Sequence, residues 1–177
     1  MTERSKFRLS FHFYIIIFVT FTYYYYICDG LCLEKLSGKI DCLVYSLTIF
    51  DMKILLPGGA GFIGSHTIIE LDKAGHEVVV VDNFVNSQPE ALRRVEKIIG
   101  KPVPFVEADI RDRAALDKVF TDYQIDAVIN FAGLKAVGES VAKPLEYYEN
   151  NMNGVFVLVD VMRQHGCKNI IFSSSAT

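Results

Sequence analysis

A cluster of glycines directly after a short apolar run constrains the fold of this chain most. Residues 52–66 read MKILLPGGAGFIGSH, so a strand-like run ends in glycines and an apolar helical pattern begins at Ile63. The spacing satisfies G-x-G-x-x-G from Gly59 and G-x-x-G-x-x-G from Gly58. Small residues let the backbone approach a pyrophosphate, and the amides of the following helix then point at its charge. The sequence therefore predicts a strand, a tight turn and a helix that bind a dinucleotide.

An acidic residue follows at the distance that such a site requires. Asp82 comes directly after four valines at 78–81, a run typical of a buried parallel strand. It lies roughly 20 residues past the glycines, where a carboxylate can accept hydrogen bonds from the adenosine ribose. The same charge would repel a 2′-phosphate, and residues 83–87 (NFVNS) offer no arginine to bind one. We therefore predict NAD rather than NADP, with a simple strand cap as the alternative role for Asp82.

The composition is that of one globular domain and argues against a nucleic-acid partner. The chain has 177 residues, 51% of them hydrophobic, and a formal net charge of −3. It has no basic stripe of the kind that binds nucleic acid. Cys28, Cys32 and Cys42 lie near the N-terminus and Cys167 stands apart, so the cysteines form no disulfide framework. Neither the cysteines nor the histidines show metal-ligand spacing, and we expect no metal site.

The first 51 residues differ in character from the rest of the chain. Residues 11–28 carry no charge and are rich in Phe, Tyr and Ile, with Arg4, Lys6 and Arg8 before them. About 18 such residues nearly span a bilayer, so a signal anchor is one interpretation, and a signal peptide without a clear cleavage site is another. We favour a third, in which residues 1–51 are an extension outside the fold and the domain begins at Met52. We accordingly expect a cytoplasmic protein, with a membrane anchor at 11–28 as the alternative.

Strand-like and helix-like patterns alternate from Met52 onward. We predict strands at 53–56, 77–81, 103–107, 127–131 and 169–172, and helices at 63–74, 89–99, 113–123 and 144–165. We expect Ile63 in the first helix and Ala114 in the third to face inward. This alternation with short connections indicates an α/β fold, a doubly wound parallel sheet of the Rossmann type. Such a sheet usually has six strands, so 52–177 would be a partial NAD-binding domain, incomplete at the C-terminus.

Three blocks of sequence carry a specific resemblance to one family. They read FAGLKAVGES at 131–140, KPLEYYENN at 143–151 and IFSSSAT at 171–177. Together with the glycine turn and residues 82–87, they resemble the UDP-glucose 4-epimerases of the extended short-chain dehydrogenase/reductase superfamily. The resemblance covers residues 52–177, the N-terminal part of such an enzyme. It implies an NAD-dependent isomerase of galactose metabolism that interconverts UDP-galactose and UDP-glucose through a 4-keto intermediate.

The resemblance also implies which residues form the site. The backbone at the start of the first helix would meet the pyrophosphate, residues 82–87 the adenosine ribose, and residues 109–110 the adenine. The implied cofactor-binding residues are Gly58, Gly61, Phe62, Ile63, Gly64, Asp82, Asn83, Phe84, Val85, Asn86, Ser87, Asp109, Ile110, Phe131, Ala132, Gly133, Leu134, Lys135 and Asn150.

Two of the implied roles concern the substrate as well. Ser175 would be the catalytic serine that hydrogen-bonds the sugar hydroxyl being oxidised, and Lys135 would reach both the nicotinamide ribose and the sugar. From the residues alone, Lys135 could equally be a solvated loop lysine, and Asn150 could simply bond a neighbouring loop.

The chain departs from the family pattern in two places. Pro57 replaces the usual threonine before the first glycine, and proline removes a backbone donor. The family's base is a Tyr-x-x-x-Lys pair in which the lysine lowers the pKa of the tyrosine, and no tyrosine here has a lysine four residues on. We therefore expect the base to lie beyond Thr177 and this chain to be inactive alone. An inactive NAD-binding module, or another nucleotide-sugar epimerase such as a UDP-glucuronate epimerase, is the alternative.

An apolar stripe along the helix predicted at 144–165 indicates a further surface. Its members recur at intervals of three and four: Leu145, Tyr148, Met152, Val155, Val159 and Met162. The resemblance implies that the complete protein is a homodimer paired through this region, and packing of the whole stripe in the core is the alternative.

Overall fold

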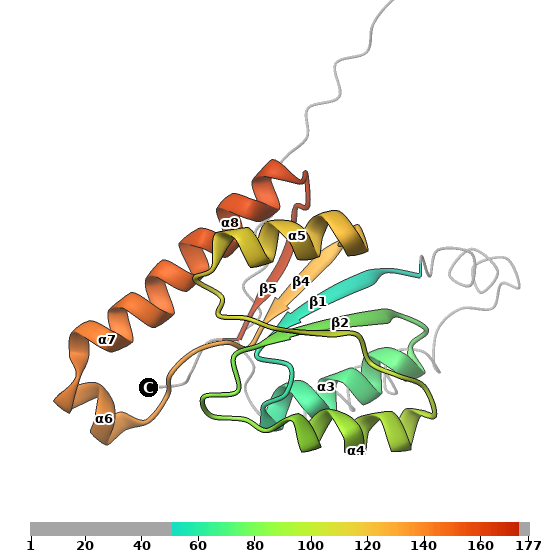
Figure 1. The fold of residues 1–177 in the computed structure, drawn as a ribbon, viewed down its shortest axis with the longest axis horizontal. Helices are drawn as coiled ribbons and strands as arrows, with labels where there is room; N and C mark the ends of the chain where they lie inside the picture. The colour runs from blue at the N-terminus through green and yellow to red at the C-terminus, as the bar shows by residue number, and fades with distance from the viewer. Residues whose placement is uncertain (1–50, 174–177) are drawn as a thin grey trace, which may run out of the picture.

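The computed structural model describes residues 51–173, which form a sheet of five strands that all run parallel (Figure 1). The strands lie in the order β3-β2-β1-β4-β5. Their bounds are β1 Lys53–Pro57, β2 Glu77–Asp82, β3 Phe105–Glu107, β4 Ala127–Asn130 and β5 Asn169–Phe172. The chain runs outward from β1 to β3 and then returns to place β4 on the other side of β1. This reversal creates a switch point between β1 and β4, where sheets of this type bind ligands.

Helices cover both faces of this sheet (Figure 1). One face carries α3 (Phe62–Lys73) and α4 (Pro89–Ile99), and the other carries α5 (Arg113–Tyr123) and α8 (Gly154–Gln164). Successive strand side chains point to opposite faces, so a strand buried on both sides must be apolar throughout. The four valines of β2 follow this rule. The predicted doubly wound Rossmann fold is confirmed.

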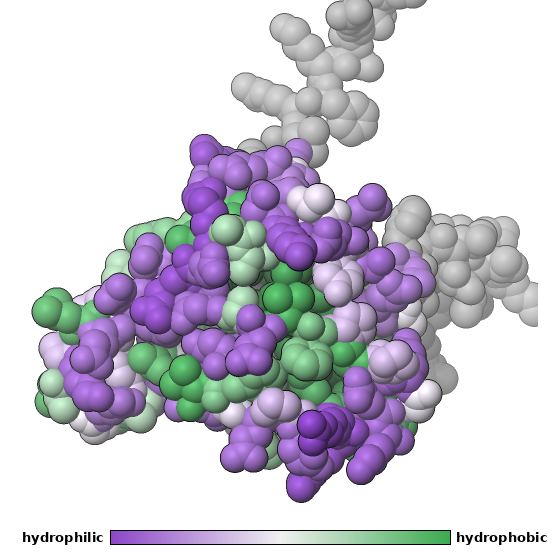
Figure 2. Space-filling view, viewed as in Figure 1, coloured by the Kyte–Doolittle hydropathy of each residue, from purple (hydrophilic) through white to green (hydrophobic). Residues whose placement is uncertain are grey.

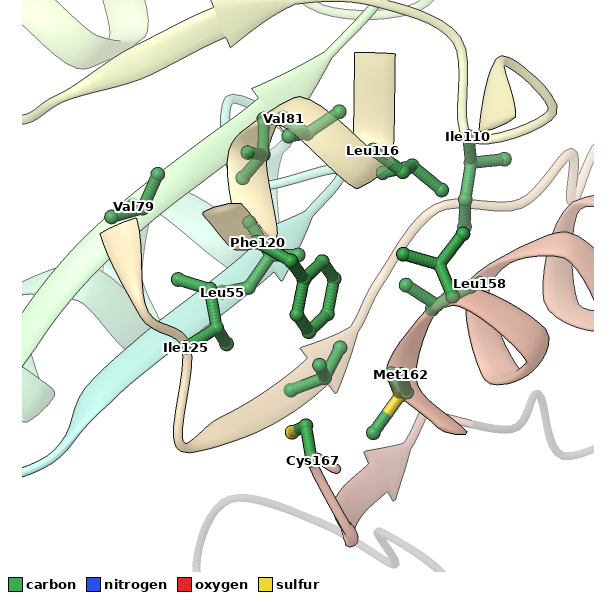
Figure 3. Close-up of a cluster of buried hydrophobic side chains, with 13 residues drawn as sticks. Leu55, Val79, Val81, Ile110, Leu116, Phe120, Ile125, Leu158, Met162 and Cys167 are labelled. Carbon is green, nitrogen blue, oxygen red and sulfur yellow. The ribbon is translucent and has the colours of Figure 1, made fainter. Parts of the chain in front are cut away.

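The larger of the two cores lies between the sheet and helices α5 and α8 (Figure 3). Leu55 from β1 and Val79 from β2 meet Leu116 and Phe120 from α5 and Leu158 from α8. All five side chains are at most 2% exposed. This packing fixes β1 relative to α5 and α8.

The predicted helix at 144–165 is a composite of three segments. It comprises α7 (Pro144–Tyr148), a π-helical turn η1 (Glu149–Asn153) and α8, and a further short helix, α6 (Val137–Ala142), precedes it. Periodicity did not predict α6 because its side chains include no buried residue.

Other boundaries differ by a few residues. β3 begins at Phe105 rather than 103, because Pro102 and Pro104 have no backbone donor and the Val103 amide donates to Glu96 Oε1 at 2.9 Å. β4 ends at Asn130, one residue before the predicted end. Strand and helix ends commonly shift by one or two residues between criteria.

Two side chains predicted to face inward are exposed. Ile63 is 47% exposed, because Gly64 and Ile68 form the buried line of α3 instead. Ala114 is exposed on α5, whose buried residues are Leu116, Val119 and Phe120. Because Gly64 has no side chain, the backbone of α3 packs directly against the turn before it.

The segment predicted at 11–28 as an anchor or extension lies outside the described residues. Within 51–173, no helix has the length and apolar character needed to cross a membrane.

Matched isoleucines on α3 and α4 test the second core. Ile68→Ala removes a side chain that is 1% exposed among the residues between the sheet and these helices. We expect it to lower the free energy of unfolding by about 2–5 kcal/mol. The control Ile98→Ala truncates a side chain that is 65% exposed, and we expect a change within about 0.5 kcal/mol. Urea denaturation measures both, and equal losses in the two variants would contradict this description of the core.

Candidate functional site

A cavity of about 390 Å³ opens where β1, β2 and β4 end, at the switch point of the sheet. Most of the residues predicted for the cofactor line it. They are Gly58, Gly61, Asp82, Asn83, Val85, Asn86, Ser87, Asp109, Ile110, Phe131, Ala132, Gly133, Leu134 and Asn150. Residues from five separate stretches of sequence therefore converge on one site.

The remaining predicted residues do not line this cavity. Phe62 and Ile63, expected to act through their backbone, have side chains that are 82% and 47% exposed. Gly64 lies behind the turn, Phe84 packs edge-on against another aromatic ring, and the Lys135 side chain is exposed. Ser175 lies outside the described residues, so its predicted role stays a prediction.

The glycine turn is packed too tightly for side chains. Gly58 has a φ of 75°, and a Cβ there would lie 2.7 Å from the backbone nitrogen of Ala132. A Cβ on Gly64 would lie 2.7 Å from the Gly58 carbonyl oxygen. The amide of Gly58 donates to the Val81 carbonyl at 2.8 Å, which ties the turn to β2. The glycines therefore bring the start of α3 directly against the ends of β1 and β4.

The start of α3 has the features of an anion-binding site. The first amides of a helix have no partner within the helix, and the helix dipole makes this end positive. Gly61 precedes α3 without a side-chain cap, and no acidic residue occupies the first turn. A phosphate placed here would meet free donors and no negative side chain of the helix.

Pro57 is accommodated as the last residue of β1. Its carbonyl accepts a hydrogen bond from the Phe131 amide at 2.9 Å, which holds the segment after β4 against the turn. The missing donor therefore falls at a strand end, where proline is tolerated.

Asp82 has a structural role as well as a place in the cavity. Its side chain is only 8% exposed. One carboxylate oxygen accepts the Ala60 amide of the glycine turn at 3.0 Å. The other accepts the Phe84 amide at 2.9 Å and the Ser87 hydroxyl at 2.7 Å. A carboxylate has about four lone-pair sites, so capacity for a ligand hydroxyl remains.

An ion pair between Arg111 and Asp109, which periodicity did not reveal, lies at one side of the cavity. Arg111 donates from Nε and Nη2 to the two carboxylate oxygens of Asp109, each at 2.8 Å, and Asn83 donates to the same carboxylate at 3.0 Å. These bonds, the Arg111 side chain first, hold the pKa of Asp109 well below its usual range. Arg111, Glu146 and Glu149 line the cavity but were not predicted. Arg111 could have been predicted from the sequence, because it directly follows Asp109 and Ile110, which were both predicted to line the site.

A doubly wound domain with a glycine turn at its switch point and a buried acid at the end of the neighbouring strand has the features of a dinucleotide-binding domain. The chain belongs to the NAD dependent epimerase/dehydratase family, whose model matches residues 54–177. It is 60% identical over 126 residues to UDP-glucose 4-epimerase of Bacillus subtilis (strain 168) and 55% identical over 131 residues to that of Homo sapiens. These alignments cover 71% of this chain but only 37% and 38% of the two relatives.

A solved structure agrees with these relatives. UDP-glucose 4-epimerase from Bifidobacterium longum in complex with NAD+ and UDP matches with a TM-score of 0.69 and 58% sequence identity. The match covers 70% of this chain and 37% of that one. The family resemblance predicted from the three sequence blocks is confirmed, and the chain corresponds to a part of the length of these proteins.

Two glycines in helices test the close packing of the turn. In Gly64→Ala the new Cβ would approach backbone atoms of Gly58 and Gly59 to 2.7 Å. We expect overpacking to cost about 1–3 kcal/mol, more than helix propensity returns. The control Gly138→Ala places its Cβ in α6 with no heavy atom within 4 Å, and we expect no loss. Urea denaturation of both variants measures the difference, and a fully stable Gly64→Ala protein would argue against a rigid turn.

The pair of Asp109 and Arg111 predicts a pH dependence. Because the folded-state pKa of Asp109 is lowered, the pair stabilises the fold at and above the ordinary carboxyl pKa of about 3.9 and is lost as the pH falls below it. We expect Asp109→Asn to cost about 1 kcal/mol at pH 7, since the pair is partly exposed to solvent. The deficit should shrink below about pH 4, because there the carboxyl of the unfolded wild-type chain binds a proton that the folded state, with its lowered pKa, does not. Unfolding free energies measured across pH, with the exposed Asp122→Asn as control, test this, and a deficit independent of pH would contradict it.

Proposed function

We propose that this chain is the NAD-binding part of a UDP-glucose 4-epimerase. The main support is the convergence of the glycine turn, Asp82 and residues 131–134 on one cavity, in a chain that is 60% identical to such an enzyme over 126 residues. The related structure from Bifidobacterium longum is a complex with NAD+ and UDP. This chain spans only 37% of that relative, so the substrates of the whole protein, UDP-galactose and UDP-glucose, are part of the proposal.

The residues present suit NAD. Phosphate oxygens would meet the free amides at the start of α3, which the closely packed glycines hold against the ends of β1 and β4. The adenosine ribose would lie at Asp82 and the adenine beside Ile110, both of which line the cavity. We assign the nicotinamide end to residues 131–135 and Asn150.

The cavity favours NAD over NADP. Asp82 would place a negative charge against a 2′-phosphate. Arg111 lines the same cavity, but its Nε and Nη2 donate to Asp109, and its Nη1 lies 4.0 Å from Glu149 Oε1. A 2′-phosphate would therefore face one carboxylate directly and compete with a second for the arginine.

In the proposed reaction, bound NAD supplies the acceptor and donor of hydride for C4 of the sugar. The residues of this chain would bind and orient the reactants: Lys135 at the nicotinamide ribose and sugar, and Ser175 at the sugar hydroxyl. The sequence contains no Tyr-x-x-x-Lys pair to accept the proton. We therefore propose that this chain alone binds NAD without turning over UDP-galactose, which makes an inactive NAD-binding module the second candidate for the isolated chain.

Three further assignments belong to the same proposal. Residues 1–51 are an extension that NAD binding does not require, the domain begins at Met52, and the protein is cytoplasmic. Family membership from residue 54 onward supports the boundary.

The complete protein would form a homodimer through the α6–α8 region. Exposed apolar side chains occur along these helices, and Figure 2 shows green apolar patches among purple polar residues at the left end of the molecule. The exposed members include Leu145, Tyr148, Met152, Phe156 and Val159. The predicted stripe was partly wrong, because Met162 is 3% exposed and packs in the core, while Phe156 takes its place on the surface.

NAD titration of the 177-residue chain tests the proposed function. We expect saturable NAD binding, weaker NADP binding and no conversion of UDP-galactose. Asp82→Asn removes the charge but keeps an oxygen acceptor, so the NAD-to-NADP preference should fall about tenfold. Asp122→Asn removes an exposed charge outside the cavity and should leave the preference unchanged. Absence of NAD binding would contradict the proposal, as would UDP-glucose formation by this chain alone.

The oligomeric state of the complete protein tests the dimer surface. Phe156→Asp places a charge on a side chain that is 63% exposed on α8 and should convert dimers to monomers. Ile98→Asp alters a side chain that is 65% exposed on α4, outside this surface, and should leave the dimer intact. Sedimentation velocity distinguishes the species, and a dimeric Phe156→Asp protein would move the interface elsewhere.

A further inference from the structure

The segment from 131 to 136 joins β4 to α6 without forming a helix or strand, yet it borders the cavity for most of its length (Figure 1). Its first residues are fixed by the sheet. The Phe131 amide donates to the Pro57 carbonyl, and the Ala132 amide donates to Asn130 Oδ1 at 3.1 Å. The later residues, Leu134 to Ala136, lie beyond the reach of these bonds and need other partners.

Asn151 supplies the first of those partners. Its side-chain Oδ1 accepts the Leu134 amide at 2.8 Å, and its Nδ2 donates to the Leu134 carbonyl at 3.0 Å. One amide side chain thus binds both backbone groups of one residue, as a neighbouring strand would. Asn150 donates to Asn151 Oδ1 at 3.0 Å, which sets the orientation of that amide.

Tyr147 supplies the second partner, one helical turn earlier. Its side chain is 9% exposed, and its hydroxyl accepts the Ala136 amide at 3.2 Å. The single hydroxyl proton is shared between the Ala136 carbonyl at 3.0 Å and Glu139 Oε2 at 2.9 Å. Burial raises the pKa of Tyr147, and the Glu139 carboxylate raises it further, so the hydroxyl keeps its proton at neutral pH.

These contacts flank a single residue. Leu134 and Ala136 are the chain neighbours of Lys135, whose side chain is exposed. Tyr147 and Asn151 are four residues apart on the composite helix and so face the same side. Asn151 lies in η1, and π-helical turns occur often at functional sites.

We propose that Tyr147 and Asn151 are positioning residues, which fix the backbone on both sides of Lys135 so that residues 131–135 meet the bound dinucleotide in one conformation. This inference rests on the proposed function, because it assigns the geometry of the same site. Neither residue needs to touch the cofactor. Preorganisation of the segment lowers the entropic cost of binding, so loss of either side chain weakens affinity.

Amide hydrogen exchange and NAD titration of the 177-residue chain test the proposal together. Asn151→Asp keeps the size and one acceptor but turns the donor that faces the Leu134 carbonyl into an oxygen. Tyr147→Phe removes only the hydroxyl. The matched controls are Asn153→Asp, on an exposed side chain of the same π-helical turn, and Tyr123→Phe on α5.

Opening of this segment is local, so amide exchange and NAD affinity should change while the global stability of the fold does not. We expect the Leu134 and Ala136 amides to exchange about tenfold faster in Asn151→Asp, and NAD affinity to fall about tenfold, with the urea midpoint close to wild type. Tyr147→Phe should act in the same direction at Ala136. Both controls should match wild type in all three measurements.

The outcomes separate this inference from the proposed function. Faster exchange at Leu134 in a chain that does not bind NAD would support the positioning role and contradict the cofactor assignment. Unchanged exchange and affinity in Asn151→Asp and Tyr147→Phe would overturn the inference. A lowered urea midpoint with unchanged NAD affinity would also overturn it, because that is the signature of a purely structural contact.

Discussion

The carboxylate of Asp82 is the interaction on which the site most depends. It lies buried at the end of β2 and binds the backbone of the glycine turn at Ala60 as well as the loop that follows β2, through Phe84 and Ser87. A buried charge is stable only when hydrogen bonds replace its hydration, and these three donors do so. The residue that we propose for the ribose therefore also joins the glycine turn to the loop after β2, so we expect a substitution that deletes the carboxylate to alter both properties.

Direct contacts between backbones hold another part of the cavity in place. The end of β1, the segment after β4 and the start of α3 approach one another so closely that their backbones take the place of side chains. Gly58 contacts the segment after β4, and Gly64 contacts Gly58. Pro57 links the same parts through its carbonyl. The amides at the start of α3 are consequently held in place before any ligand arrives, which is the condition for strong electrostatic binding of a phosphate.

Local patterns predicted the fold, the glycine turn and Asp82, whereas most of the other residues that line the cavity were predicted through the family resemblance. Glycine spacing, the valine run before Asp82 and the β-α alternation each follow from backbone geometry and burial. The composite helix was not predictable in this way. A π-helical turn does not follow the α-helical period, and α6 buries no residue that would reveal a period. Residue spacing also did not reveal that Arg111 donates to the Asp109 carboxylate, or that the Tyr147 hydroxyl accepts the Ala136 amide. Such contacts depend on tertiary proximity.

The three walls of the cavity are thus each anchored by a different kind of contact. Asp82 holds the glycine turn, Arg111 and Asn83 hold Asp109, and Asn151 holds Leu134 in the segment after β4. None of these anchors needs a ligand to form. A cavity organised in advance spends little free energy on rearrangement when a dinucleotide binds, so more of the contact energy remains as affinity. Since every one of these anchors lies between residues 58 and 151, the proposed cofactor site takes shape without the residues that would perform the chemistry.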